Sequence, residues 1–175
     1  MAGKFYIRAA MQNTRKQARE RFARQVTGLW TFRAFLLLKL PIALFSGLRV
    51  RQLTAESCTV SIPFKWLTQN PFRSVYFASQ AMAAEMSTGI LGLMALQGCD
   101  PTVSMLVTKL EAAFTKKATG RVYFTCGDGR AIFDAVEKTM VTGEGVTVRC
   151  TSVGRMGDGT EVSRFLVEWS FKRKR

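Results

Sequence analysis

Hydrophobic and polar residues alternate in several stretches after Gly47, a pattern typical of strands that bury one face. The first two stretches are residues 48–52 and 58–64, which predict a strand pair joined near residues 54–56. Further strands are predicted over residues 103–114, 121–126, 146–153 and 161–171. Asp158 and Gly159 predict a tight turn between the last two strands.

Two stretches among these strands follow a helical pattern instead. Residues 76–96 are rich in Ala, Met and Ser and predict a long helix that stops before Gly98. Residues 129–140 predict a short helix that covers one end of the sheet. Because each strand has one apolar face that needs cover, the order of elements predicts an α+β fold. We expect a long antiparallel β-sheet curled round a single central α-helix.

The N-terminal residues 1–45 predict a helical arm, distinct from a domain over residues 46–175. Residues 12–25 are polar and basic and suit an exposed helix. Residues 27–45 are mostly apolar, but Arg33, Lys39 and Pro41 interrupt them, so the run falls short of the ~20 apolar residues of a spanning helix. This segment either docks on the core or lies in a membrane interface with its basic neighbours facing headgroups. Docking is favoured, because most apolar helices of soluble chains pack on a core.

The composition excludes several kinds of catalytic site. The chain contains no His, which rules out Ser-His-Asp and Cys-His triads and histidine-ligated metals. The cysteines are widely spaced and form no CxxC pair: Cys58, Cys99, Cys126 and Cys150. We expect buried free thiols in a reducing cytoplasm, with no visible activator for a cysteine nucleophile, and no metal or separate cofactor.

The formal net charge is +14, and its distribution is uneven. Basic residues dominate both ends of the chain, and Glu20 is their one acidic neighbour in the N-terminal arm. They are Lys4, Arg8, Arg15, Lys16, Arg19, Arg21, Arg24, Arg33, Lys172, Arg173, Lys174 and Arg175. Such a field attracts nucleic acid, anionic lipid or the phosphates of coenzyme A, although a solubilising surface is the commoner explanation. Few aromatic side chains accompany the basic arm, so we expect no nucleic-acid partner.

The segment at residues 70–89, NPFRSVYFASQAMAAEMSTG, places one carboxylate, Glu85, in the middle of the predicted central helix. It resembles the central segment of hotdog-fold acyl-CoA thioesterases, whose pattern is roughly N-P-x-G-x-x-H-G-G followed by an Asp or Glu. Asn70 matches the Asn, Tyr76 the His, Ala78 the second Gly, and Glu85 the acid. The resemblance covers residues 42–175. It is closest to an uncharacterised group of proposed thioesterases with an N-terminal apolar helix.

Two positions depart from that pattern. Arg73 stands where a Gly is usual, and Phe77 replaces the first Gly after the His. Both add bulk where the resemblance places the passage for an acyl thioester, so we expect that passage to be narrowed or reshaped. Loss of catalysis would leave an acyl-thioester or lipid binder, which is the alternative function. A dehydratase of the same fold is disfavoured, because such enzymes resemble a His-dependent pattern.

Thioester hydrolysis needs an activated water and donors aimed at the developing oxyanion. A helix N-terminus supplies free N–H groups, which here belong to residues 77–79. Glu85 can take a proton from water or attack the carbonyl itself, Asn70 can orient the water, and Tyr76 can donate a hydrogen bond. Each has a structural alternative: Glu85 an ion pair with an arginine (Arg73, Arg49 or Arg51), Asn70 a turn, and Tyr76 a core position.

The spacing also bears on assembly. Tyr76 and Glu85 lie nine residues apart, or ~13 Å of helix on nearly opposite faces. Two chains about a two-fold axis can bring the Glu85 of one to the amides of the other, and the resemblance also implies sites at a dimer interface. We therefore expect a homodimer or a tetramer that hydrolyses acyl-CoA or acyl-carrier-protein thioesters. Around Gly120, Lys116, Lys117 and Arg121 are candidates for gripping coenzyme A phosphates, or simply a solvated strand end.

Overall fold

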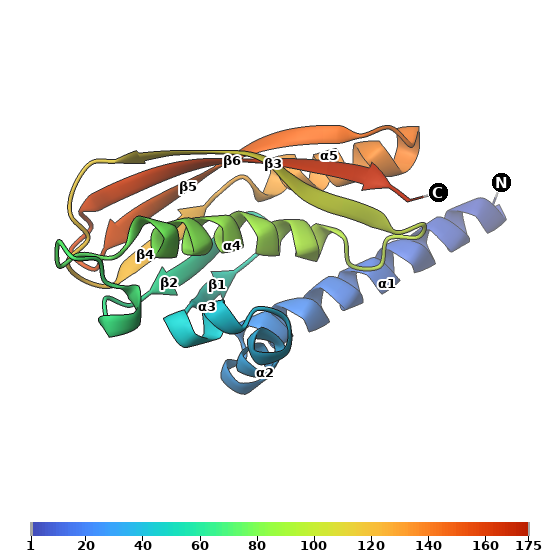
Figure 1. Ribbon diagram of the computed structural model, residues 1–175. Helices are drawn as coiled ribbons and strands as arrows, with labels where there is room; N and C mark the ends of the chain where they lie inside the picture. Colours follow the sequence, from blue (N-terminus) through green and yellow to red (C-terminus); the bar gives the residue numbers. More distant parts are fainter. Residues whose placement is uncertain (1, 175) are drawn as a thin grey trace.

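Figure 1 shows the computed structural model of the chain, which describes the backbone of residues 2–174 and the side chains of residues 12–174. The side chains of Lys4 and Arg8, and all of Arg175, lie outside the described residues. The elements are α1 (Ala2–Thr27), α2 (Leu29–Lys39), α3 (Pro41–Ser46), β1 (Arg49–Leu53), β2 (Cys58–Ile62), the 3₁₀ turn η1 (Trp66–Thr68), α4 (Phe77–Ala95), β3 (Val103–Phe114), β4 (Val122–Cys126), α5 (Gly129–Thr142), β5 (Val146–Met156) and β6 (Glu161–Arg173).

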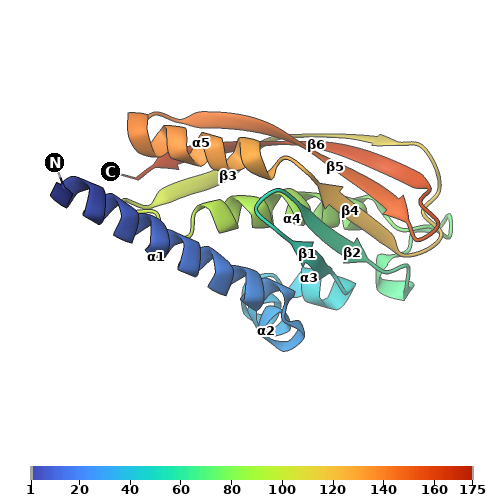
Figure 2. The ribbon, with the colours of Figure 1, turned by 180° about the vertical axis from the view of Figure 1, so that it is seen from behind.

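The strands form one antiparallel sheet in the order β1-β2-β4-β5-β6-β3. The sheet curls round α4, and α5 packs beside α4 at the end of the sheet (Figures 1 and 2). This confirms the predicted α+β architecture and each predicted strand. Gly159 takes a φ of +83°, as the predicted turn between β5 and β6 requires.

Small residues on α4 let the sheet approach closely. A Cβ added at Gly92 would lie 2.6 Å from the Met105 methyl group, and one at Gly89 would lie 3.2 Å from the Trp169 ring. Phe124, Phe165 and other apolar side chains of the strands fill the core beneath the helix. The small side chains that the sequence places in this helix therefore determine how tightly the sheet wraps.

The N-terminal residues form three helices rather than the two predicted segments. The apolar run breaks at Leu40, which has a φ of −144° just before Pro41, so α2 and α3 meet at an angle. Phe32, Leu36 and Ala43 are buried in the core, which is the docking that the sequence favoured. The opposite face of these helices stays exposed. The division of the chain at residue 45 stays a prediction. Among the described residues, no helix is long and apolar enough to cross a bilayer.

Helix α1 is held to the domain both by arginines and by apolar side chains near its end, where Val26 is buried in the core and Phe22 packs against it. Arg15 donates to the Glu137 carboxylate on α5 at 3.1 Å. Arg19 donates to the Ala95 carbonyl at 3.3 Å, and its guanidinium lies 4.6 Å from the Phe133 ring centroid. The expectation of an exposed helix is therefore only partly met, because Arg15 and Arg19 anchor it to the end of α4 and to the middle of α5.

Gly129 is a position where the fold requires glycine. It opens α5 directly against the β1–β2 turn, and its N–H donates to the Glu56 carbonyl at 3.0 Å. A Cβ would clash with the Ala55 carbonyl oxygen and lie 2.7 Å from the Glu56 carbonyl carbon. Both are backbone atoms, which cannot move away as the end of a flexible side chain could. We expect Gly129→Ala to lower the free energy of unfolding by about 1–3 kcal/mol in urea denaturation. Gly127→Ala, with no atom within 4 Å of the added Cβ, is the matched control, and equal losses in both variants would contradict this account.

Candidate active site

The Asn-Pro turn ahead of α4 is organised by the Asn70 side chain. Its Oδ1 accepts hydrogen bonds from the N–H of Phe72 at 3.0 Å and of Ser74 at 3.1 Å, and from the Ser74 hydroxyl at 3.1 Å. Arg73 takes a φ of +56°, a left-handed conformation that favours Gly. The turn therefore has the backbone of a Gly-containing turn although an Arg occupies the position. The Asn70 oxygen serves the turn, which is the structural role that the sequence offered for it.

Helix α4 begins with backbone donors that have no partner. Tyr76 precedes the helix with an extended backbone, and no side chain caps it. Among the described residues, no acceptor pairs with the N–H groups of Phe77, Ala78 or Ser79. The Tyr76 ring is 44% exposed, so this residue is not part of the core. Free amides and the positive end of the helix dipole make this terminus attractive to a developing negative charge.

A pocket of about 610 Å³ opens at this helix start. Its lining includes Asn70, Tyr76, Phe77, Lys116 and Lys117. The structure thus brings together Asn70, Tyr76, Lys116 and Lys117, four of the residues that the sequence proposed for the site. Ala78 lies in the same turn of helix but does not line the pocket.

Glu85 lines a second pocket, of about 250 Å³, whose walls are almost entirely apolar. Helix α2 contributes Phe32 and Phe35, and β6 contributes Trp169. The Glu85 carboxylate lies so close to the backbone at Gly89 that a Cβ there would be 3.2 Å from its Oε1.

No ion pair or side-chain hydrogen bond reaches the Glu85 carboxylate from the described side chains, so the arginine pairing weighed from the sequence is not observed. Burial raises the pKa of Glu85 above its ordinary value, because the charged form is poorly solvated in this pocket. Other polar side chains of α4 do have partners: Ser87 pairs with Ser152 at 2.8 Å, and Thr88 accepts from the Trp169 indole at 2.9 Å. The unpaired acid in the apolar pocket is the feature of α4 that calls for a chemical explanation.

The raised pKa of Glu85 predicts how the stability of the protein depends on pH. The folded state holds its Glu85 proton to a higher pH than the unfolded state, so the free energy of unfolding falls as pH rises from the unfolded value through the folded one. We expect Glu85→Gln to stabilise the protein at neutral pH, by about 1.4 kcal/mol for each unit of pKa elevation, and to leave stability unchanged below pH ~4. Urea denaturation across this pH range measures it, with exposed Glu20→Gln as control. A variant that is less stable than wild type at pH 7 would contradict the prediction.

The two pockets share no lining residue. The Glu85 pocket reaches Met105 near the start of β3, whereas the pocket at the α4 terminus reaches Phe114 at its end. Within one chain, the acid and the free amides therefore belong to separate pockets at opposite ends of the edge strand.

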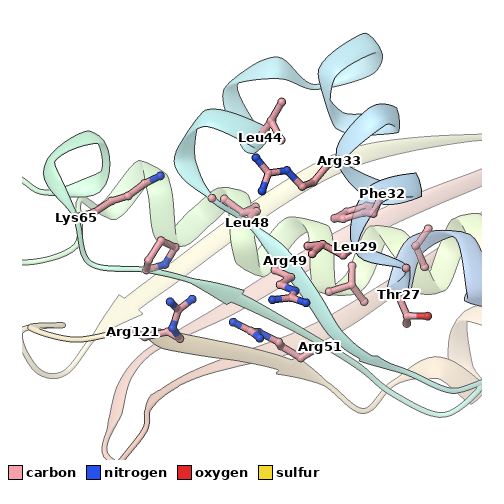
Figure 3. Close-up of a pocket in the computed structure, with 15 residues that line it drawn as sticks. Thr27, Leu29, Phe32, Arg33, Leu44, Leu48, Arg49, Arg51, Lys65 and Arg121 are labelled. Atoms are coloured by element: carbon pink, nitrogen blue, oxygen red, sulfur yellow. The ribbon is translucent and has the colours of Figure 1, made fainter.

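Arg121 is separated from Lys116 and Lys117. The N–H of Val75 donates to the Ala118 carbonyl at 2.8 Å, which fixes the chain between the lysines and β4. Arg121 instead lines a third pocket, of about 280 Å³, shown in Figure 3. This pocket also contains Arg33, Arg49, Arg51 and Lys65, a cluster that sequence reasoning missed. Its only local signal is the outward pair Arg49 and Arg51 on one strand, and the other members come from distant segments.

The cysteine thiols are poor candidates for catalysis. All four are free, and three of them are buried. Burial raises the pKa of Cys58 to about 12, and a hydrogen bond with Cys126, together with burial, raises the pKa of Cys150. The thiolate forms of Cys58 and Cys150 are therefore scarce near neutral pH. Among the described side chains, no group of three His, Cys, Asp or Glu residues lies close enough together to hold a metal ion.

Several solved structures share this architecture. A protein of unknown function from Pseudomonas aeruginosa, described as a probable thioesterase, aligns over 82% of this chain and 95% of its own, with a TM-score of 0.70 and 16% identity. A protein of unknown function from Chlorobaculum tepidum covers 92% of this chain and 98% of its own, with a TM-score of 0.70 and 14% identity. A thioesterase family protein from Silicibacter pomeroyi covers 87% and 99%, with a TM-score of 0.61 and 11% identity.

These similarities show the fold, which is the hotdog fold expected from the sequence. No curated protein matches the chain. Residues 28–170 match the family described as a domain of unknown function (DUF4442), and the chain belongs to that family.

Proposed function

We propose that the protein hydrolyses acyl thioesters at a site completed by two copies of the chain. The observation that carries this proposal is Glu85, an unpaired carboxylate in an apolar pocket on the central helix, with a raised pKa. A general base works best when its pKa lies near the operating pH, and burial moves a carboxylate in that direction. The naming of similar structures as thioesterases supports the reaction class.

The edge strand β3 offers a way to join the two pockets. It pairs with β6 on one side, and its other edge is unpaired in the single chain. Leu110 and Phe114 share the sheet face of Val167 and Phe165, yet they remain 42% and 49% exposed in the single chain, although Phe114 lies near the Phe77 ring of α4. An exposed edge with bare apolar side chains is suited to pairing with another strand. A homodimer formed through β3 would cover both the unpaired strand edge and these apolar side chains.

Two β3 strands that pair antiparallel about a two-fold axis run in opposite directions. The Met105 end of one strand then meets the Phe114 end of its partner, nine residues or about 30 Å along the strand. The Glu85 pocket of one chain would thus face the α4 terminus of the other. The resulting site would contain an acid, free N–H donors and the lysines of the larger pocket.

In this site Glu85 would take a proton from water, whose oxygen attacks the thioester carbonyl. The free N–H groups at the start of the partner's α4 would donate to the oxyanion. Collapse of the tetrahedral intermediate breaks the C–S bond, and the thiolate takes up the proton held by Glu85. Direct attack by Glu85 on the carbonyl, followed by hydrolysis of the anhydride, uses the same groups. Asn70 holds the turn that sets the start of α4.

Lys116 and Lys117 would bind phosphates of a coenzyme A or acyl-carrier-protein thioester, since both line the pocket at the α4 terminus. We expect the double variant Lys116→Ala/Lys117→Ala to raise KM for acyl-CoA about tenfold, with kcat largely kept, as the loss of charge-assisted contacts predicts. Steady-state kinetics measures this, with an N-acetylcysteamine thioester as the phosphate-free comparison substrate. Equal KM increases for both substrates, or none, would refute phosphate binding here.

The proposed activity is tested by thiol release from a panel of short, long and aromatic acyl-CoAs. We expect turnover by the wild-type protein on at least one of them. No turnover on any acyl-CoA or acyl-carrier-protein substrate by a folded dimer would overturn the proposal.

A non-catalytic acyl-thioester binder is the second candidate, and one observation favours it. The Phe77 ring is 55% exposed at the α4 terminus, packs 4.8 Å from the Tyr76 ring and lies 6.5 Å from the Phe114 ring. It stands where the resembling family has Gly. Tight binding of a non-hydrolysable acyl-CoA analogue without turnover, and turnover gained in Phe77→Gly, would favour this candidate.

A further inference from the structure

Helices α2 and α3 expose an apolar face that the core does not use. Phe32 and Leu36 are buried in the core, and the side chains on the opposite side of α2 turn away from it. The outward side chains form what we term the outer apolar face: Trp30 (77% exposed), Leu37 (55%), Leu38 (78%), Ile42 (65%) and Phe45 (60%). Soluble proteins rarely leave so many large apolar side chains together in water without a partner.

A cluster of cationic side chains lines a pocket between these helices and β1. Arg49 and Arg51 project from β1 and gather with Arg121, while Arg33 reaches in from α2 and Lys65 from the segment after β2 (Figure 3). The pocket of about 280 Å³ that these side chains line has no Asp or Glu in its walls. A pocket lined by five cationic side chains and by no acidic one favours an anion.

The basic side chains are partly positioned by hydrogen bonds. The Arg51 Nε–H donates to the Ser61 hydroxyl at 2.8 Å, which holds its guanidinium beside the strand. The Lys65 ammonium donates to the Phe45 carbonyl at 2.8 Å. Burial and the neighbouring charges of Arg49 and Arg121 lower the pKa of Arg51. These contacts leave guanidinium N–H donors available to bind a phosphate in the forked geometry that arginine favours.

The cation pocket and the outer apolar face are continuous. The Arg33 guanidinium lies 5.9 Å from the Trp30 ring centroid, so one side chain belongs to both. Lys65 likewise joins the pocket to α3 through the Phe45 carbonyl. Helix α2 has 11 residues, about 16 Å, which is roughly half the thickness of a bilayer's hydrocarbon core. A short helix with one apolar side and flanking cations suits a position in the plane of an interface.

We infer that this side of the molecule binds membranes that contain anionic phospholipids. The lipid phosphate would enter the pocket of Arg33, Arg49, Arg51, Lys65 and Arg121, and the outer apolar face would rest at the boundary of headgroups and acyl chains. A second copy of the chain is a poor occupant, because a two-fold contact would press the same cations against each other. Nucleic acid would satisfy the cations but leave Leu38 and Ile42 against a polar backbone. The inference does not depend on the proposed hydrolysis.

Co-sedimentation of the 175-residue chain with lipid vesicles tests this inference. We expect binding to vesicles of phosphatidylcholine with about a third phosphatidylglycerol, weakened by added salt, and at least tenfold weaker binding to pure phosphatidylcholine. Arg49→Gln/Arg121→Gln should weaken binding to the anionic vesicles about tenfold or more. Arg130→Gln/Lys138→Gln, which removes the same charge from the exposed surface of α5, should have a much smaller effect.

The apolar contribution has its own readout. Leu38→Asp/Ile42→Asp should abolish vesicle binding while thermal denaturation stays near wild type, because both side chains are exposed. Tryptophan emission should shift to the blue on binding, and the shift should be largely lost in Trp30→Phe.

Three outcomes would overturn the inference: equal binding to neutral and anionic vesicles, equal losses in the two charge-removal variants, or binding of DNA or inorganic phosphate through Arg49 and Arg121 without vesicle binding.

Discussion

Replacing Glu85 with Gln is expected to lower the rate of thioester hydrolysis by about 10²–10⁴-fold, the usual contribution of a positioned general base. The amide keeps the size and polarity of the side chain but cannot take a proton from water or attack a carbonyl. No described side chain depends on the carboxylate for a hydrogen bond or an ion pair, so its removal should not destabilise the fold. The same substitution should even raise stability at neutral pH, as argued above.

The combination of lost turnover and gained stability is specific to a functional carboxylate. A structural acid would show the reverse, since its removal would destabilise the fold before it affected the rate. Thiol release from the best acyl-CoA substrate measures the effect, with Glu20→Gln as a control that changes an exposed acid on α1. A rate within twofold of wild type for Glu85→Gln would remove Glu85 from the mechanism.

Leu110→Glu is expected to prevent the proposed dimer from forming and to abolish turnover at the same time. Leu110 lies on the unpaired edge strand β3, faces the same side as Val167, and is 42% exposed in the single chain. A pair of buried carboxylates near the two-fold axis would be strongly unfavourable, because each would lose its hydration. If the acid of one chain acts on substrate held by the other, monomers have no complete site.

Sedimentation velocity and thiol release on the same preparations measure both effects. Val141→Glu is the matched control, because this exposed valine on α5 lies away from β3. A Leu110→Glu monomer that keeps wild-type turnover would show that one chain suffices. A wild-type protein that is monomeric at micromolar concentration would contradict the β3 interface itself.

The sequence was sufficient for the sheet and its central helix because both leave strong local signals. The one-sided alternation of residues 161–171 predicts a half-buried strand, and β6 pairs along that whole length. The small residues around Glu85 predict a helix that a sheet can approach closely. The partly buried position of Glu85 follows from the same pattern, because a helix wrapped by a sheet exposes little of its surface.

The grouping of cations was not predictable from the sequence. Arg121 is near Lys116 and Lys117 along the chain, yet Ala118 is tied to Val75 and the chain then turns into β4. Arg121 reaches Arg51 only because β4 and β1 flank β2 in register. Arg33 joins them only because α2 docks through Phe32. Each contact depends on tertiary packing between segments far apart in sequence, which no local pattern records.

A heterodimer of two inactive chains tests most directly whether two chains complete one active site. One chain carries Glu85→Gln, and the other carries Ala78→Pro, which removes a free N–H from the first turn of α4, where proline is tolerated. Differently tagged chains are co-expressed and the heterodimer is purified for the thiol-release assay. A site shared by two chains leaves one complete acid-and-amide set, so the heterodimer should recover about half of the wild-type rate although each homodimer is inactive. A heterodimer as inactive as its parents would contradict the two-chain site.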